Sequence, residues 1–440
     1  MAAHAEPFPH VWRAHRRPWP VWPVSRWLAQ VHPPVWVWWT PAGWGYVAWG
    51  AAQQVHAEGA ARYARVRAAV EAGGWTWAAD AVEAPPEAEP RWFGGFAFDP
   101  RPRPSQGWWT AFGHARFFLP RYLYAQSPTG RAWLTVLTRA HEVPRWPSQT
   151  ATARSRPRPW PARLADEEGM TRAQWRALVR SALEHLRRGA LHKVVLARTQ
   201  RLRWHAPPPW EAVWTRLDRA YPRTYRFLYR PGADLTAFVG ASPELLVRVR
   251  GRSLETMALA GSIARGRDPA EDAALAAALL ASAKDRHEHA WVVQAIREAL
   301  APLTETLEVP PEPQVRQYAN IQHLYTPIRG LLRRPGVWEA VERLHPTPAL
   351  GGYPRAAALA FIAAHEPVPR GWYAAPLGWV TPNGDGEFVG AIRCAVLRAN
   401  AALLYAGAGI VADSDPEREW EEIDLKFRAM RRVLGEEDEL

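Results

Sequence analysis

Lysine is rare in this chain, and one lysine lies where it could act as a base. Only three of the 55 basic residues are lysines, namely Lys193, Lys284 and Lys426. Lysine can lose its proton when it is desolvated, whereas arginine cannot. Lys193 lies in an apolar predicted strand, where a period of two places it on one face with Val195 and Ala197. It is therefore either an edge residue with its ammonium in water or a desolvated general base.

A glutamate at the start of a second apolar strand could supply a matching acid. Glu244 lies in the segment Gly-Ala-Ser-Pro-Glu-Leu-Leu-Val. Ser-Pro-Glu is compatible with a plain turn whose carboxylate is solvated. A carboxyl group walled by leucine and valine would instead have a raised pKa and could donate a proton near neutrality. Together with Lys193 on a neighbouring strand, it would form an opposed acid–base pair.

Two charged runs could supply oxygen ligands for a metal ion. In the first, His287 and His289 flank Glu288 at the start of a predicted helix, but residues two apart do not share a helical face, so the zinc pattern is absent. In the second, Glu419 and Glu422 share a face, and crowded carboxylates repel unless a cation neutralises them. Both runs are either solvated helix ends or a site for Mg²⁺, which takes one or two carboxylates and leaves other positions to water and an anionic substrate.

Two further features could hold an anion. Gly409 lies in Ala-Gly-Ala-Gly-Ile-Val, where backbone N–H groups could approach a carboxylate, although a glycine pair can also reflect tight strand packing. Arg393 is a charge inside an apolar strand and requires an anionic partner. Its neighbour Cys394, the only cysteine, has no evident base and is interpreted as a core residue.

The elements that must position these residues suggest an α+β fold with large antiparallel sheets flanked by helices. We predict an N-terminal part, residues 1–165, which is rich in Trp and Arg and consists of strands with one helix near residues 55–72, and a catalytic region, residues 166–440. The residues around 144–161 are interpreted as an exposed connection. The other predicted helices are 175–186, two within 269–300, 353–364 and 415–434, and the predicted strands are 191–199, 238–249, 253–259, 403–411 and a hairpin around 383–386.

Composition excludes several classes of protein. The 440 residues contain one cysteine and no apolar stretch near 18 residues, which argues against a disulfide scaffold and a membrane span. The N-terminus lacks the layout of a signal peptide, so we expect a cytoplasmic protein. The net charge of +12 lies mostly in residues 1–165, where 19 arginines face 9 acidic residues and 17 of the 26 tryptophans also lie. This basic, Trp-rich part leaves a nucleic-acid-binding module open as a minor alternative.

The ordered motifs resemble the chorismate-binding enzymes and, within them, the isochorismate synthases. The blocks are most similar to the synthases of menaquinone synthesis, and siderophore or salicylate supply stays open as the pathway. The resemblance covers roughly residues 166–434, and the weaker match of FGGFAFDP lies in the N-terminal part. The blocks that carry it are HKVVLAR, GASPELL, ETMALAGSIARG, KDRHEH, QHLYTPIRG, LHPTPALGGYP, YAAPLGWVTPNGDGEFVGAIRCAV and AGAGIVADSDPEREWEEIDLK. It implies one large domain, into which the N-terminal part is integrated.

The resemblance also implies a role for each residue. Lys193 would activate the water that attacks C2 of chorismate, and Glu244 would protonate the departing C4 hydroxyl. Glu288 and Glu422 would bind Mg²⁺, with Glu419 assisting through water. The enolpyruvyl carboxylate would contact Arg393, Tyr373 and the backbone at Gly409, and the pocket would be lined by Gly261, Ser262 and His323.

The same resemblance bears on the reaction subtype. Aminating relatives generally lack the lysine at position 193 and read Pro-Ile-Ala-Gly or Pro-Ile-Lys-Gly where this chain has Ala258 to Gly261, so Leu259 is a synthase-like residue. No glutamine amidotransferase partner is therefore expected. Threonine is usual at the position of Ser262, which leaves a salicylate synthase that also eliminates pyruvate as the alternative. A chorismate-binding pseudoenzyme is disfavoured, because no carried-over catalytic position is missing.

Overall fold

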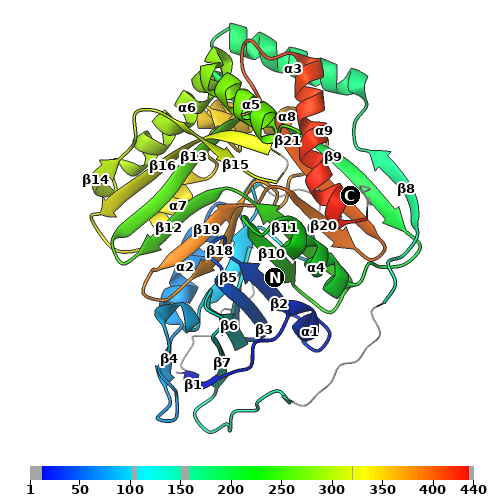
Figure 1. The fold of residues 1–440 in the computed structure, drawn as a ribbon. Helices are drawn as coiled ribbons and strands as arrows, with labels where there is room; N and C mark the ends of the chain where they lie inside the picture. The colour runs from blue at the N-terminus through cyan, green and yellow to red at the C-terminus, as the bar shows by residue number, and fades with distance from the viewer. Residues whose placement is uncertain (1–11, 102–106, 150–157, 320, 436–440) are drawn as a thin grey trace.

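The computed structural model describes residues 12–101, 107–149, 158–319 and 321–435 (Figure 1). The strands of these segments are β1 (Trp12–Pro18), β2 (Val35–Trp39), β3 (Gly45–Ala57), β4 (Trp75–Trp77), β5 (Trp92–Phe96), β6 (Ala115–Gln126), β7 (Ala132–Thr138), β8 (Arg163–Glu168), β9 (Lys193–Trp204), β10 (Tyr225–Arg230), β11 (Thr236–Ser242), β12 (Leu245–Arg250), β13 (Ser253–Ala264), β14 (Thr304–Glu308), β15 (Gln314–Gln317), β16 (Ile321–Leu332), β17 (Gly352–Tyr353), β18 (Pro376–Val380), β19 (Gly386–Gly390), β20 (Cys394–Arg398) and β21 (Ala401–Ile410). The helices are α1 (Val24–Leu28), α2 (Arg62–Ala72), α3 (Arg172–Arg187), α4 (Trp210–Ala220), α5 (Pro269–Ala281), α6 (Ala283–Leu300), α7 (Trp338–Leu344), α8 (Arg355–His365) and α9 (Pro416–Val433), with a 3₁₀ turn at Pro86–Ala88.

Antiparallel pairing dominates the sheet, as the strand pattern predicts. One run of neighbours is β8–β9–β21–β20–β11–β10–β2–β3–β6–β7–β1, and a second leaves β6 through β5–β18–β19–β12–β13–β16. The pairing of β1 with β4 is parallel. Helices cover the outer faces of these sheets (Figure 1), so the predicted α+β class is confirmed.

Strands from the N-terminal part pair directly with strands from the catalytic region. β2 pairs with β10, and β5 pairs with β18. The boundary at residue 165 therefore falls within a continuous sheet. The division into an N-terminal part and a catalytic region with separate roles stays a prediction.

The tryptophans of the N-terminal part mostly fill the core. The buried ones are Trp12, Trp19, Trp22, Trp27, Trp36, Trp38, Trp49, Trp92 and Trp133. Arginines pack on several rings, as Arg26 does on Trp22 with its guanidinium carbon 3.6 Å from the ring centroid. Nucleic-acid stacking needs clustered exposed aromatic rings. Among the described tryptophans the most exposed is Trp77, at 38%, and the Arg16 guanidinium lies over its ring. The packing therefore accounts for this composition without a nucleic acid.

Two predicted elements differ from the structure. The helix expected from residue 55 begins at Arg62, because β3 continues to Ala57 and pairs with Ala115 there. The strand expected over 238–249 is divided into β11 and β12, and Glu244 lies in the break between them. The predicted connection at 144–161 is irregular where it is described, and residues 150–157 lie outside the described residues.

Helix ends are fixed by the capping residues that the sequence supplies. Thr171 and Gln174 form a capping box at the start of α3. The Asp415 carboxylate accepts hydrogen bonds from the N–H groups of Glu417 and Arg418 and so begins α9. Helix α9 then packs on β21 and beside α3 (Figure 1). None of the described helices is long and apolar enough to cross a membrane.

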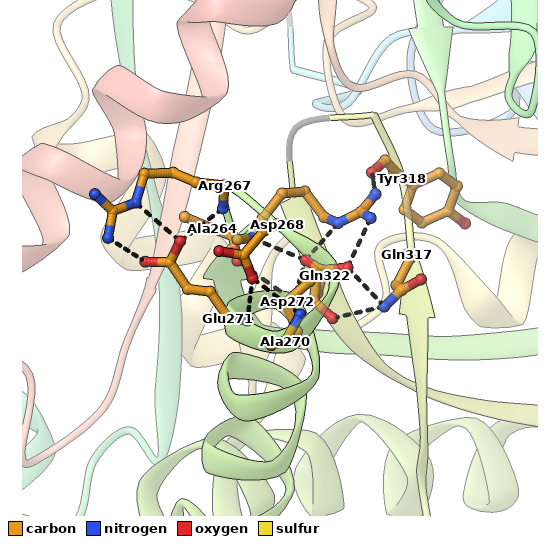
Figure 2. A network of polar contacts seen from close by, with 11 residues as sticks. Ala264, Arg267, Asp268, Ala270, Glu271, Asp272, Gln317, Tyr318 and Gln322 are labelled. Carbon is orange, nitrogen blue, oxygen red and sulfur yellow. Dashed lines mark hydrogen bonds and ion pairs between the residues drawn. The ribbon is translucent and has the colours of Figure 1, made fainter.

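A polar network fixes the segment that joins β13 to α5 (Figure 2). The Arg265 guanidinium donates two hydrogen bonds of 2.7 Å to the Asp272 carboxylate and a third to the Tyr318 carbonyl oxygen. The Tyr318 hydroxyl donates to the carbonyl oxygen of Pro243 at 3.0 Å. Because Pro243 directly precedes Glu244, the network anchors the segment next to the predicted acid.

Candidate active site

Eleven of the twelve predicted site residues line one cavity. These residues come from several strands, helices and loops that are far apart in the sequence, and the fold brings them together. These residues are Lys193, Glu244, Leu259, Gly261, Ser262, Glu288, His323, Tyr373, Arg393, Gly409 and Glu422. The twelfth, Glu419, is buried beside the cavity but does not line it.

Lys193 forms an ion pair in the wall of the cavity. Its side chain is 1% exposed, and its Nζ lies 2.7 Å from Oε1 of Glu288 on α6. The neighbouring strand β21 leaves room for this pair because it carries Gly409: a Cβ there would lie 2.5 Å from Glu288 Oε1 and 2.8 Å from Lys193 Cε. The glycine is thus required by a close approach of side chains. This contact is a packing reason for Gly409 that is independent of any substrate.

Replacement of Gly409 by alanine is expected to lower turnover by about tenfold or more, because the new methyl group must displace the Lys193–Glu288 pair from its position. The measurement is kcat, determined for the variant over the same range of substrate concentrations as for the wild type. Gly74→Ala is the matched control, since a Cβ there meets nothing within 4 Å. Equal activity of the two variants would show that the pair does not need its present geometry.

Glu244 is a buried carboxyl group held between two strands. Its N–H donates to Ser242 Oγ at 3.2 Å, and Ser242 Oγ donates to the Gly390 carbonyl oxygen at 2.6 Å. Burial raises the pKa of Glu244 to about 7, against the opposing charges of Lys193 and Arg393. A carboxylic acid with this pKa is half protonated near neutrality and suits general acid catalysis.

Glu419 and Glu422 both lie on α9 and both carry a lysine partner. Glu419 is 2% exposed and accepts from Lys284 Nζ at 2.9 Å and Ser414 Oγ at 2.8 Å. Glu422 accepts from Lys426 Nζ at 2.6 Å. Burial, followed by the neighbouring charge of Glu422, raises the pKa of Glu419 to about 7.

The carboxylates fit a magnesium ion in number and chemistry, but not as a closed cage. Within the described segments, no three His, Cys, Asp or Glu side chains converge as a metal-binding group. Glu288 and Glu422 nevertheless line the same cavity. Mg²⁺ commonly binds one or two carboxylates and completes its shell with water and substrate oxygens. The arrangement therefore fits two direct carboxylate ligands, with Glu419 farther out.

Another part of the cavity wall is suited to an anion. Arg393 is 8% exposed, has a left-handed backbone with φ of 50°, and forms no ion pair with a carboxylate in the described part of the chain. Burial lowers the pKa of its guanidinium. An unpaired buried cation is costly by several kcal/mol, so the site favours an anionic ligand.

His323 is neutral and bridges this arginine to the cavity wall. Burial lowers its pKa well below the usual range, and the charge of Arg393 acts in the same direction. Its Nδ1 lies 3.2 Å from the Gly261 carbonyl oxygen and 2.9 Å from Ser262 Oγ, while Nε2 lies 3.5 Å from Arg393 Nη2. Since a carbonyl oxygen only accepts and a guanidinium only donates, the proton is placed on Nδ1.

Tyr373 is fixed by ring packing. Its ring stacks on Tyr405 with a centroid distance of 5.0 Å, and burial raises the pKa of its hydroxyl. The hydroxyl approaches Gly407, where a Cβ would lie 2.8 Å away. Tyr373 thus presents a protonated hydroxyl that can donate to an anion.

Sequence reasoning missed several residues of the cavity wall. Lys426 is the most informative, because its Nζ binds both Glu422 and the Gly407 carbonyl oxygen, the latter at 2.7 Å. The scarcity of lysine and the position of this one, four residues after Glu422, are signals that could have identified it. Gly407, the other glycine of the Ala-Gly-Ala-Gly pair, also lines the cavity. Tyr405, Leu350 and Ile392 line it as well, and no feature of the sequence distinguishes them from core residues.

A larger hollow of about 490 Å³ lies on the other side of Tyr405, next to Trp108, Trp109 and Phe98. Its buried charges already satisfy each other, as the Arg370 guanidinium donates to the Glu366 carboxylate at 2.8 Å. Its lining within the described residues brings together no acid–base pair of the kind formed by Lys193 and Glu244. We therefore place the chemistry in the smaller cavity of about 70 Å³.

Comparison with known proteins identifies the family of this chain. The family described as chorismate binding enzyme matches residues 26–435. The chain belongs to the chorismate-binding enzyme family. The match includes most of the N-terminal part, and the resemblance seen in the sequence motifs is confirmed.

Several relatives of this chain are isochorismate synthases. The chain is 42% identical over 411 residues to the salicylate biosynthesis isochorismate synthase of Pseudomonas aeruginosa, covering 91% of this chain and 84% of the relative. It is 35% identical over 355 residues to the isochorismate synthase MenF of Bacillus subtilis, covering 78% and 74%. The solved structure of MenF, the menaquinone-specific isochorismate synthase from Escherichia coli, has a TM-score of 0.79 at 29% identity and covers 98% of this chain and 97% of that one. The predicted enzyme class, an isomerase of the hydroxymutase type, is confirmed.

Proposed function

We propose that this protein converts chorismate to isochorismate with Mg²⁺, by attack of water at C2 and loss of the C4 hydroxyl. The observation that carries the proposal is the meeting of Lys193 and Glu244 in one cavity, where burial brings the pKa of Glu244 to about 7. The isochorismate synthases among the relatives support the same reaction.

The reaction needs one base and one acid. Lys193 would accept a proton from water as the water oxygen bonds to C2. The two ring double bonds shift, the C4–O bond breaks, and Glu244 would give its proton to the departing hydroxyl. One water enters and one water leaves, so substrate and product have the same mass. A positioned acid–base pair of this kind contributes about 10²–10⁴-fold for each group.

The two carboxylates of the dianionic substrate would be held by different charged groups of the cavity. Mg²⁺, when bound, would hold the ring carboxylate, with Glu288 and Glu422 as ligands and Glu419 assisting through water. Arg393 and Tyr373 would hold the enolpyruvyl carboxylate, with backbone near Gly409 assisting. Leu259, Gly261, Ser262 and His323 would line the pocket, as they line the cavity of the structure.

The test of this function is product analysis with purified protein, chorismate and Mg²⁺. We expect isochorismate as the main product, identified by NMR and by its unchanged mass. Salicylate with an equal amount of pyruvate would move the protein to the alternative, a salicylate synthase, which the smaller side chain of Ser262 keeps open. Anthranilate formed in the presence of ammonia would contradict the subtype.

We further propose that the isochorismate serves menaquinone synthesis in the cytoplasm and that no glutamine amidotransferase partner is needed. The similarity to MenF of Escherichia coli, a menaquinone-specific isochorismate synthase, and to MenF of Bacillus subtilis supports the pathway. The Pseudomonas aeruginosa relative is instead an isochorismate synthase of salicylate biosynthesis. Deletion of the coding sequence should deplete menaquinone. Loss of salicylate with normal menaquinone would assign the protein to the other pathway.

A further inference from the structure

The three lysines of the chain are matched one to one with the three candidate metal-binding carboxylates. Lys193 pairs with Glu288 at 2.7 Å, Lys284 pairs with Glu419 at 2.9 Å, and Lys426 pairs with Glu422 at 2.6 Å. The other 52 basic residues are arginines. With every carboxylate ionised, the cluster is electrically neutral without any metal.

The three pairs differ in their position relative to the cavity. Lys193, Glu288, Lys426 and Glu422 line it, whereas neither Lys284 nor Glu419 does. Lys284 instead lines a different hollow of about 350 Å³, together with His192, His287 and Trp291. A cation in the cavity can therefore contact the pairs of Glu288 and Glu422 directly. It can act on the pair of Lys284 and Glu419 only by long-range electrostatic interaction.

Of the two pairs that face the cavity, the pair of Lys193 and Glu288 is the more deeply buried. Its side chains are 1% and 13% exposed, against 14% and 27% for Lys426 and Glu422. The side of Gly409 is closed, because even a Cβ does not fit there. A metal ion and the ammonium group on this one enclosed carboxylate would repel each other strongly at low dielectric constant.

We propose that Lys193 is the internal counter-ion of Glu288 and competes directly with the divalent cation for this carboxylate. This inference rests on the proposed function, because it takes Glu288 as a metal ligand. Lysine suits this place, as its ammonium is a single compact charge on a flexible stem that can leave a carboxylate, whereas arginine makes a rigid forked contact. Metal binding at Glu288 would therefore displace the side chain of Lys193, which is also the predicted base.

Competition predicts that removing the ammonium improves metal binding while it removes catalysis. In calorimetric titration of the substrate-free protein with MgCl₂, Lys193→Met should bind Mg²⁺ with a dissociation constant about tenfold or more below that of the wild type. Lys284→Met is the matched control: it removes one equal charge from the same cluster but outside the cavity, and its gain should be clearly smaller. Lys193→Gln is the second variant, and circular dichroism checks the folding of each protein.

The outcomes separate this inference from the proposed function. An unchanged or weaker Mg²⁺ affinity in both Lys193 variants would overturn the competition, as would an equal gain in Lys284→Met. Glu288→Gln tests the ligand role itself: if it binds Mg²⁺ as the wild type does, the metal assignment fails, and with it the inference. Product analysis of the wild type is independent of all these affinities.

Discussion

Replacement of Lys193 by methionine is expected to lower kcat for isochorismate formation by about 10³-fold or more, while the protein stays folded. Methionine keeps the unbranched apolar stem that packs in this buried position, 1% exposed, and removes only the amine. Without the amine, the cavity loses the group to which we assign the proton of the attacking water. Initial rates of isochorismate formation and a thermal melt of the same preparation measure both parts of this expectation.

Lys193→Arg distinguishes a base from a fixed positive charge. Arginine keeps the charge that would pair with Glu288, but its guanidinium does not give up its proton in proteins. We expect this variant to be as inactive as Lys193→Met. Activity within about tenfold of the wild type would assign Lys193 an electrostatic role and remove it as the base.

Replacement of Glu244 by glutamine is expected to lower kcat by about 10²–10⁴-fold, because the amide cannot protonate the leaving hydroxyl. Glutamine has nearly the same shape and leaves the bond from the N–H of this residue to Ser242 Oγ in place. Chorismate binding, measured by fluorescence titration, should therefore change much less than kcat. A loss of binding alone, with kcat preserved, would show that Glu244 holds the substrate and is no acid.

The pH dependence gives Glu244 a second signature. Burial raises its pKa to about 7, so the acid form is present below this pH and is lost as the pH rises through it. Since kcat/KM reports groups of the free enzyme, the wild-type profile should fall above about pH 7 for this reason. The residual activity of Glu244→Gln should lack this descending limb, and a limb with the same midpoint in the variant would assign it to another group.

The fold can be predicted where short-range patterns determine it. The Asn-Gly-Asp-Gly turn predicts the hairpin of β18 and β19, and the helical spacing of apolar residues predicts α3 and the amphipathic helix α9. The sequence pattern places the start of α2 too early, because the end of β3 is fixed by pairing with β6, a contact that local sequence does not encode. For the same reason the pattern does not reveal the break at Glu244.

The site is predictable residue by residue but not in its pairing. The motifs select eleven residues that the fold brings to one cavity, and the resemblance to a family, rather than spacing, assigns their roles. Only the pair of Glu422 and Lys426 can be inferred from the sequence, since these residues are four apart on one helix. The partners of Lys193 and Lys284 come from distant elements, so their pairing depends on the tertiary structure.

The most direct test of the account is the origin of the new hydroxyl group. With chorismate and Mg²⁺ in water enriched in ¹⁸O, attack of water at C2 followed by loss of the C4 hydroxyl places one ¹⁸O atom in each product molecule. We predict isochorismate that is heavier by the mass difference of the two oxygen isotopes, with the label at C2. Unlabelled isochorismate would mean that the original hydroxyl migrates within the ring, and it would contradict the roles of Lys193 and Glu244 together.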